Sequence, residues 1–195
     1  GHATPAVACI KELQERGYVD LTYIGQKHSL LFDKNFSSEY RLITEKVKIP
    51  FLSILAGKVS LFPNFQSVIW LLRLPIGFIQ AFWWQIIKRP NLVLTFGSHV
   101  GVPVVFWAWV FRTPIIAHEQ TMTIGRANRF IEKLATKVCL SWPALRQAQG
   151  DTGNVMVSLS NHDSTKSVLT GNPIRAEVLT SEKSYFDFAD SKRPV

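Results

Sequence analysis

Two short stretches decide the fold: residues 91–97 read NLVLTFG, and residues 114–120 read PIIAHEQ. Each is a brief run of apolar residues that gives way to glycine or to polar residues. Uninterrupted apolar runs of this length are typical of strands buried on both faces of a parallel sheet. Between them, residues 104–111 form an apolar segment of helical length. The order strand, helix, strand is therefore predicted.

The same alternation extends outward from these strands. The further expected elements are a helix at 4–17, strands at 21–24 and 40–43, a helical region at 65–88 interrupted at Pro75 and Gly77, a helix at 126–135 and a strand at 138–140. Alternation of this kind predicts an α/β fold, a Rossmann-like parallel sheet with helices on both faces. In such folds ligands bind at the carboxyl ends of the strands.

Length and composition predict one domain. The chain has 195 residues, of which 47% are hydrophobic and 18% charged, so it can bury a full core. We expect the domain to cover residues 1–178, with a polar insertion at about 146–167, and residues 179–195 to be a tail or the start of a linker. Because residues 1–5 contain neither an initiator Met nor the features of a signal peptide, we expect the chain to be truncated at its front.

The formal net charge of +8 raises the question of an anionic partner. Nucleic acid is not favoured, because the basic residues are scattered and no helix-turn-helix, RRM-like or zinc motif occurs. Cys9 and Cys139 show neither the spacing of a zinc site nor that of a disulfide framework. An anionic membrane surface and a phosphate-bearing substrate remain as candidate partners, and the alternative is a basic, soluble surface without such a partner.

Residues 68–87 are rich in aromatic and aliphatic side chains but carry an arginine, a proline and two glutamines. This composition favours a segment at a membrane interface, or one packed in the core against the sheet, over a segment that spans a bilayer. The expected membrane-contact residues are Trp70, Arg73, Phe82, Trp83, Trp84 and Lys88.

Polar residues gather where predicted strands give way to helices. Gly1-His2 precedes the first helix, Gly97-Ser98-His99 follows one buried strand, and residues 118–121, read HEQT, follow the next. Glycine at such turns lets backbone amides approach a phosphate or sugar closely. These positions are therefore site candidates, although each motif alone is also compatible with an ordinary turn.

Four motifs occur in an order that resembles the MurG family of peptidoglycan N-acetylglucosaminyltransferases. Residues 1–6, GHATPA, resemble the end of that family's first glycine-rich loop, and residues 96–103 resemble its second. Residues 115–120, IIAHEQ, resemble its HEQN segment, and residues 170–175, TGNPIR, resemble the sequence that closes its N-terminal domain. Together these motifs bracket nearly the whole chain.

The resemblance implies the N-terminal, acceptor-binding half of a GT-B enzyme, peripheral to the cytoplasmic face of the bacterial membrane. Such an enzyme transfers N-acetylglucosamine from UDP-N-acetylglucosamine to lipid-linked muramoyl-pentapeptide, the donor being bound by a C-terminal domain. No organic cofactor is expected. The sequence has no Asp-x-Asp-like motif, so no metal-binding residues are predicted, and stimulation by metal ions stays open. His2 is the expected general base, because an imidazole is partly neutral near pH 7 without a large pKa shift. A loop-orienting or substrate-binding role for His2 is the alternative.

The resemblance also implies substrate-binding positions. These are Gly1, Gly97, Ser98, His99, Val100, His118, Glu119, Gln120, Thr121, Asn172 and Arg175. Residues 97–100 would cradle the acceptor's diphosphate, and the arginine would lie near the donor. Ser98-His99 and Thr121 depart from the family's usual Gly-Tyr and Asn. Two other functions stay open: a noncatalytic subunit that recruits a donor domain to the membrane, and a GT-B transferase for another lipid acceptor.

Overall fold

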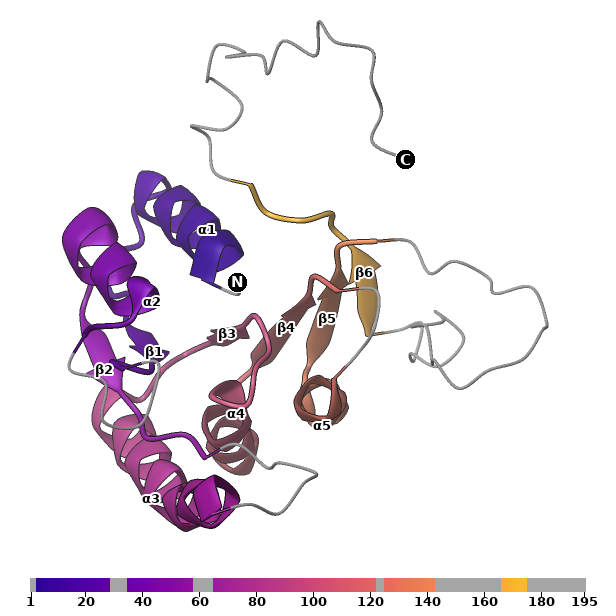
Figure 1. Cartoon of the computed structure of the whole chain (residues 1–195). Helices are drawn as coiled ribbons and strands as arrows, with labels where there is room; N and C mark the ends of the chain where they lie inside the picture. Colours follow the sequence, from indigo (N-terminus) through magenta and orange to yellow (C-terminus); the bar gives the residue numbers. More distant parts are fainter. Residues whose placement is uncertain (1–2, 29–34, 58–64, 122–124, 143–165, 175–195) are drawn as a thin grey trace, which may run out of the picture.

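The computed structural model describes residues 3–28, 35–57, 65–121, 125–142 and 166–174, with 65–73 described by their backbone alone (Figure 1). Within these residues the strands form two parallel sheets. The smaller sheet pairs β1 (Tyr23–Gly25) with β2 (Phe51–Ser53). The larger has the order β3 (Val93–Thr95), β4 (Ile115–Glu119), β5 (Lys137–Leu140) and β6 (Ser167–Leu169). The predicted parallel α/β fold is confirmed.

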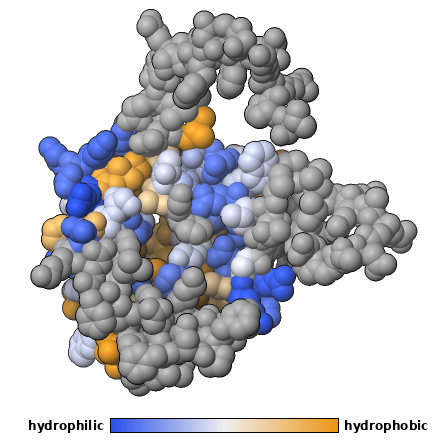
Figure 2. Space-filling view, in the orientation of Figure 1, coloured by the Kyte–Doolittle hydropathy of each residue, from blue (hydrophilic) through white to orange (hydrophobic). Residues whose placement is uncertain are grey.

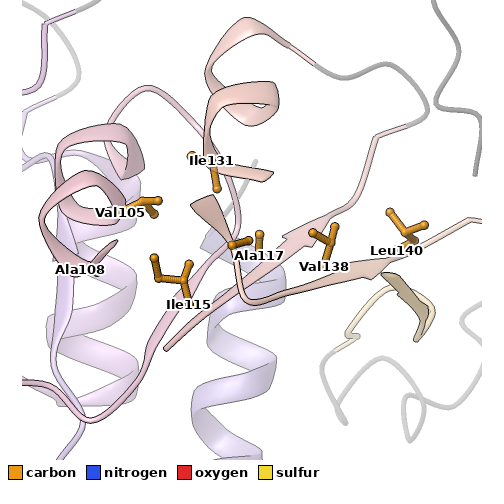
Figure 3. Packing of buried hydrophobic residues seen from close by; sticks show 8 residues of the cluster. Val105, Ala108, Ile115, Ala117, Ile131, Val138 and Leu140 are labelled. Atoms are coloured by element: carbon orange, nitrogen blue, oxygen red, sulfur yellow. The ribbon is translucent and has the colours of Figure 1, made fainter. Parts of the chain in front are cut away.

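The main core lies between the larger sheet and two helices, α4 (Gly101–Val110) and α5 (Arg126–Leu134). Figure 3 shows side chains from α4, α5, β4 and β5 converging there. The buried members are Val105, Ala108, Ile115, Ala117, Ile131, Ala135, Val138 and Leu140. Burying each valine, leucine or isoleucine of this cluster contributes about 1.5–3 kcal/mol, so this contact is the principal support of the larger sheet.

Helix α1 (Ala3–Glu15) lies on the side of the larger sheet that faces away from α4 and α5 (Figure 1). Val138 and Leu140 point into the core beneath β5, so Cys139 between them points to the other face. Burial, and then the neighbouring Cys139 thiol, raise the pKa of the Cys9 thiol on α1. The two thiols are therefore neighbours across that face, and both are free. Helices cover both faces of the sheet, as predicted.

A second core joins α1 to the smaller sheet and corrects one prediction. Residues 40–43 are not a strand, because they belong to α2 (Ser38–Arg41) and a following π-helix, η1 (Leu42–Val47). Ser37 caps α2 by accepting a hydrogen bond from the Tyr40 amide at 3.1 Å. The side chains of Ile43 and Val47 then fall on one helical face and pack with Val7 of α1. Tertiary packing thus outweighs the strand propensity of this segment.

Helix α3 (Phe65–Lys88) runs without the predicted interruption at Pro75 and Gly77. Its second half is held against α4 by aromatic packing, in which the Phe82 ring lies 4.8 Å from that of Trp107. The Trp107 indole also donates a hydrogen bond to the Phe78 carbonyl at 2.8 Å. These contacts hold the second half of α3 against α4 although Pro75 lacks an amide donor for the helix.

Several boundaries differ from the expected ones. The strands β2 and β6 were not predicted, and β4 continues to Glu119, so that His118 and Glu119 are its last two residues rather than the start of a loop. Gly17 ends α1 as expected: its φ is +86°, and the Tyr18 amide donates to the Leu13 carbonyl at 3.0 Å. Most of the predicted insertion, and the tail at 179–195, lie outside the described residues.

Candidate functional site

The turn between β3 and α4 has an unusual backbone conformation. Gly97 has a φ of +85° and Ser98 a φ of +77°, so two consecutive residues occupy the left-handed region. For Ser98 this conformation costs roughly 1–3 kcal/mol and persists only where neighbouring contacts impose it. In the space-filling view a hydrophilic (blue) area lies over the middle of the molecule, next to an apolar (orange) area over α1 (Figure 2).

Asn128, on the first turn of α5, contacts this turn. The Ser98 amide donates a hydrogen bond to Asn128 Oδ1 at 3.0 Å. Asn128 Nδ2 in turn donates to Glu119 Oε2 at 2.7 Å. A Cβ on Gly97 would lie 2.6 Å from the Asn128 amide, so only glycine allows this close approach. One side chain therefore joins the turn after β3 to the end of β4.

Glu119 is buried at the end of β4, with 4% of its surface exposed. Its other oxygen, Oε1, accepts hydrogen bonds from the Thr121 amide at 2.8 Å and from the Thr121 hydroxyl. A buried carboxylate needs such charge-assisted hydrogen bonds to offset its desolvation. Both carboxylate oxygens thus contact protein donors, and the predicted pair of Glu119 and Thr121 is brought together.

His118 connects β4 to the segment that follows β6. Its Nε2 lies 3.1 Å from the Gly171 carbonyl, and because a carbonyl can only accept, Nε2 carries the proton in this contact. Only 5% of His118 is exposed. The imidazole therefore holds the 170–172 segment against the larger sheet, and Asn172 follows directly as an exposed residue.

The other predicted positions fall into two groups. The Gln120 carbonyl accepts a hydrogen bond from the Trp142 indole at 3.2 Å, the His99 ring lies 3.3 Å from the Ser98 hydroxyl, and Val100 is the residue before α4. Gly1, His2 and Arg175 lie outside the described residues. Sequence reasoning gave Asn128 no role of its own; the available signal was its place, downstream of HEQT, in the family resemblance.

Glu132 lies one turn beyond Asn128 on α5, and the pKa of its carboxyl group is raised. Burial, and then the negative charge of Glu119, raise the pKa of Glu132 from 4.5 to about 7. The folded state therefore binds more protons than the unfolded state between these values, so stability falls as the pH rises through this window. We expect Glu132→Gln to raise the free energy of unfolding at pH 8 by about 1–2 kcal/mol, after allowance for partial exposure, and to change it little at pH 5.

Urea denaturation at the two pH values measures this effect. Glu45→Gln is the matched control, since Glu45 is an exposed glutamate on η1. We expect the control to shift stability equally at both pH values. An equal shift for Glu132→Gln would mean that Glu132 is ionised alike in the folded and unfolded states.

The second half of α3 carries an exposed apolar stripe at helical spacing. Its members are Ile76, Ile79, Trp83, Ile86 and Ile87. Trp83 is 55% exposed, whereas its neighbours Phe82 and Trp84 are half-buried. Lys88, the last residue of the helix, is exposed. The side chains of Trp70 and Arg73 lie outside the described set. Within the parts of the chain that the structure describes, no helix has both the length and the apolar character that a membrane span requires.

A parallel sheet whose carboxyl edge carries a turn with two residues at positive φ, a buried carboxylate and a bridging amide defines the class, an α/β domain. In that class ligands bind at the carboxyl ends of the strands. The chain belongs to the family described as Glycosyltransferase family 28 N-terminal domain, which matches residues 1–140. The match covers α1 and each strand of the larger sheet up to the end of β5. This result confirms the family predicted from the four motifs.

Named relatives share sequence over almost the whole chain. A UDP-N-acetylglucosamine--N-acetylmuramyl-(pentapeptide) pyrophosphoryl-undecaprenol N-acetylglucosamine transferase of Clostridium kluyveri is 33% identical over 94% of this chain and 45% of its own length. The transferase of the same name from Clostridium novyi is 33% identical over 100% of this chain and 49% of its own. The chain thus spans about half the length of the curated relatives it matches.

A solved structure has the same fold. The crystal structure of Acinetobacter baumannii MurG matches with a TM-score of 0.60 and 21% sequence identity, covering 94% of this chain and 43% of that one. At this identity the likeness concerns the fold. It agrees with the predicted GT-B-type N-terminal half.

Proposed function

We propose that this chain is the acceptor-binding half of an inverting N-acetylglucosaminyltransferase. The donor is UDP-N-acetylglucosamine, and the acceptor is a lipid-linked muramoyl-pentapeptide diphosphate. The relatives' names describe this transfer, and the family match over residues 1–140 supports its assignment here. A second, donor-binding domain completes the reaction site, and the reaction needs no organic cofactor.

The observation that carries the proposal is the arrangement at the carboxyl edge of the larger sheet. The turn at Gly97-Ser98, the buried Glu119 and Asn128 form one connected set of hydrogen bonds at 2.7–3.0 Å. Groups fixed in this way are preorganised. They can therefore bind a charged ligand without a further entropic cost of ordering the site. Motifs from separate parts of the sequence thus meet where an α/β domain binds its ligand.

In the proposed complex, residues 97–100 face the acceptor's diphosphate, and the backbone of Gly1 contributes to substrate binding. The Ser98 amide is engaged by Asn128, so its contribution is to fix the turn. Glu119, Thr121 and Gln120 hold the end of β4 in position. His118 holds the backbone at Gly171. Asn172 and Arg175, which follow in the sequence, contact the substrates, and the arginine contacts the donor.

The test is transfer of radiolabelled N-acetylglucosamine from its UDP donor to the lipid-linked acceptor, with this chain joined to a donor-binding domain of the same family. Acceptor binding by the chain alone, in detergent micelles, is measured in parallel. Product formation is the expected result. Acceptor binding without product would instead favour a noncatalytic recruiting subunit, and absence of both would contradict the proposal.

The exposed stripe on α3 supports a second part of the proposal, contact with an anionic membrane from the cytoplasmic side. A helix face with large apolar side chains beside cationic ones binds such surfaces through apolar burial and electrostatic attraction together. Trp83 and Ile87 supply the apolar contact, and Lys88 supplies positive charge at the end of the helix. The acceptor is itself anchored in that membrane, so this contact brings the site to its substrate.

We expect Trp83→Ser to lower binding to anionic vesicles by roughly tenfold, because a large exposed apolar contact is removed. Its free energy of unfolding should change by less than about 1 kcal/mol, since the side chain is already exposed in the folded state. Vesicle cosedimentation and urea denaturation measure the two quantities.

Phe82→Ser is the matched control on the same helix. The Phe82 ring packs against Trp107, so this variant should lose about 2–4 kcal/mol of stability. Unfolding of Trp83→Ser, or vesicle binding equal to that of the parent chain, would assign Trp83 to packing instead of the membrane.

A further inference from the structure

The geometry points to Asn128 as a positioning residue that sets the conformation of the acceptor-binding turn. It acts through a hydrogen-bond relay that runs from Glu119 through Asn128 to the Ser98 amide. Its carboxamide accepts from the Ser98 amide and donates to Glu119, so each half of the group has one defined partner. The identity of the ligand rests on the proposed function, whereas the relay itself does not.

The direction of each hydrogen bond is fixed by chemistry. A backbone amide can only donate, so Oδ1 of Asn128 must face Ser98. A carboxylate can only accept, so Nδ2 must face Glu119. Asparagine satisfies both demands at once, and an aspartate would place two negative oxygens against each other.

The relay has a mechanical consequence for the turn. Ser98 is held at a φ of +77° and Gly97 at +85°, conformations that need outside support. Asn128 contacts both residues: it accepts from Ser98, and its carboxamide fills the space that a Cβ of Gly97 would occupy. Without the relay the turn relaxes, and an ordering cost is added to acceptor binding.

The proposal can be tested by exchanging the hydrogen-bond donor and acceptor between positions 119 and 128. Asn128→Asp should break the relay by like-charge repulsion, and Asn128→Ala should break it by deletion. In the double variant Asn128→Asp with Glu119→Gln, the new glutamine amide donates to the new aspartate, while its carbonyl oxygen can still accept from Thr121. Ser98 can again donate to residue 128, so the double variant should restore the relay. Arg126→Ala, an exposed change on the same helix, is the control.

Two measurements on the whole chain decide the outcome: hydrogen exchange of the Ser98 amide without ligand, and affinity for the lipid-linked acceptor in micelles. We expect exchange about tenfold faster and affinity about tenfold weaker in each single variant, with both restored toward the parent values in the double variant. Because a general loss of stability would not be repaired by reversing the polarity of one pair, the rescue distinguishes positioning from folding.

Unchanged Ser98 exchange in Asn128→Ala would overturn the proposal, and so would faster exchange with unchanged acceptor affinity. Failure of the double variant to restore either quantity would also count against it. If the parent chain itself does not bind the acceptor, the proposed function fails, and the exchange data then decide the relay by themselves.

Discussion

His2→Ala is expected to lower the rate of N-acetylglucosamine transfer by about 10²–10⁴-fold, the usual contribution of a positioned general base. In the proposed reaction the acceptor hydroxyl must lose its proton as it attacks the anomeric carbon, and an imidazole can accept that proton near pH 7. His2 directly precedes α1, which begins at Ala3. The measurement is kcat/KM for transfer, with the chain joined to a donor-binding domain.

Two further readouts separate a base from a binding residue. Loss of a base lowers kcat and removes the acidic limb of the pH–rate profile, whereas loss of a binding contact raises KM with kcat unchanged. His28→Ala is the matched control, because His28 is an exposed imidazole after β1 that contacts the Asn35 carbonyl. A kcat for His2→Ala equal to that of the control would assign the base to another group.

The framework of the site could be predicted from sequence because it depends on local pattern. Residues 93–95 and 115–119 are strands, as their apolar runs indicate, and Gly97 has the positive φ that its place after a strand suggests. Parallel strands end at one edge, so the nearness of the Gly97 turn to Glu119 followed from topology.

The contacts within the site could not be predicted in this way. Asn128 lies 30 residues beyond Ser98, and their hydrogen bond depends on how α5 packs over the sheet. The role of His118 likewise depends on Gly171, 53 residues away. Pairings at such separation are set by tertiary packing, which a single sequence does not encode in any local pattern.

The misassigned segment at 40–43 has a similar cause. Tyr, Leu and Ile favour strands, but Ser37 caps a helix there, and Ile43 is fully buried against α1. The predicted interruption at Pro75 and Gly77 was also wrong, because these two helix-breaking residues lie inside a continuous helix. For Gly77 the structure supplies a reason, since a Cβ at this position would lie 2.5 Å from the Leu55 carbonyl oxygen.

Gly77 allows the connection from β2 to lie directly against α3. The Leu55 amide donates a hydrogen bond to the Gln80 side chain at 2.7 Å, one turn along the helix, and the adjacent Ile54 and Ala56 are buried. The close approach of the Leu55 backbone is therefore part of a packed interface. A side chain at position 77 would push this backbone away from the helix and weaken the interface around it.

Gly77→Ala should therefore lower the free energy of unfolding by about 2–3 kcal/mol, measured by urea denaturation. The sign is informative, because in a helix that met no obstacle the same change would stabilise by about 1 kcal/mol through helix propensity alone. Gly125→Ala is the control: Gly125 has a φ of −69° and nothing within 4 Å of an added Cβ, so its effect should stay below about 1 kcal/mol. A neutral or stabilising Gly77→Ala would mean that the connection does not rest on α3, and that the glycine is an ordinary interruption of the helix.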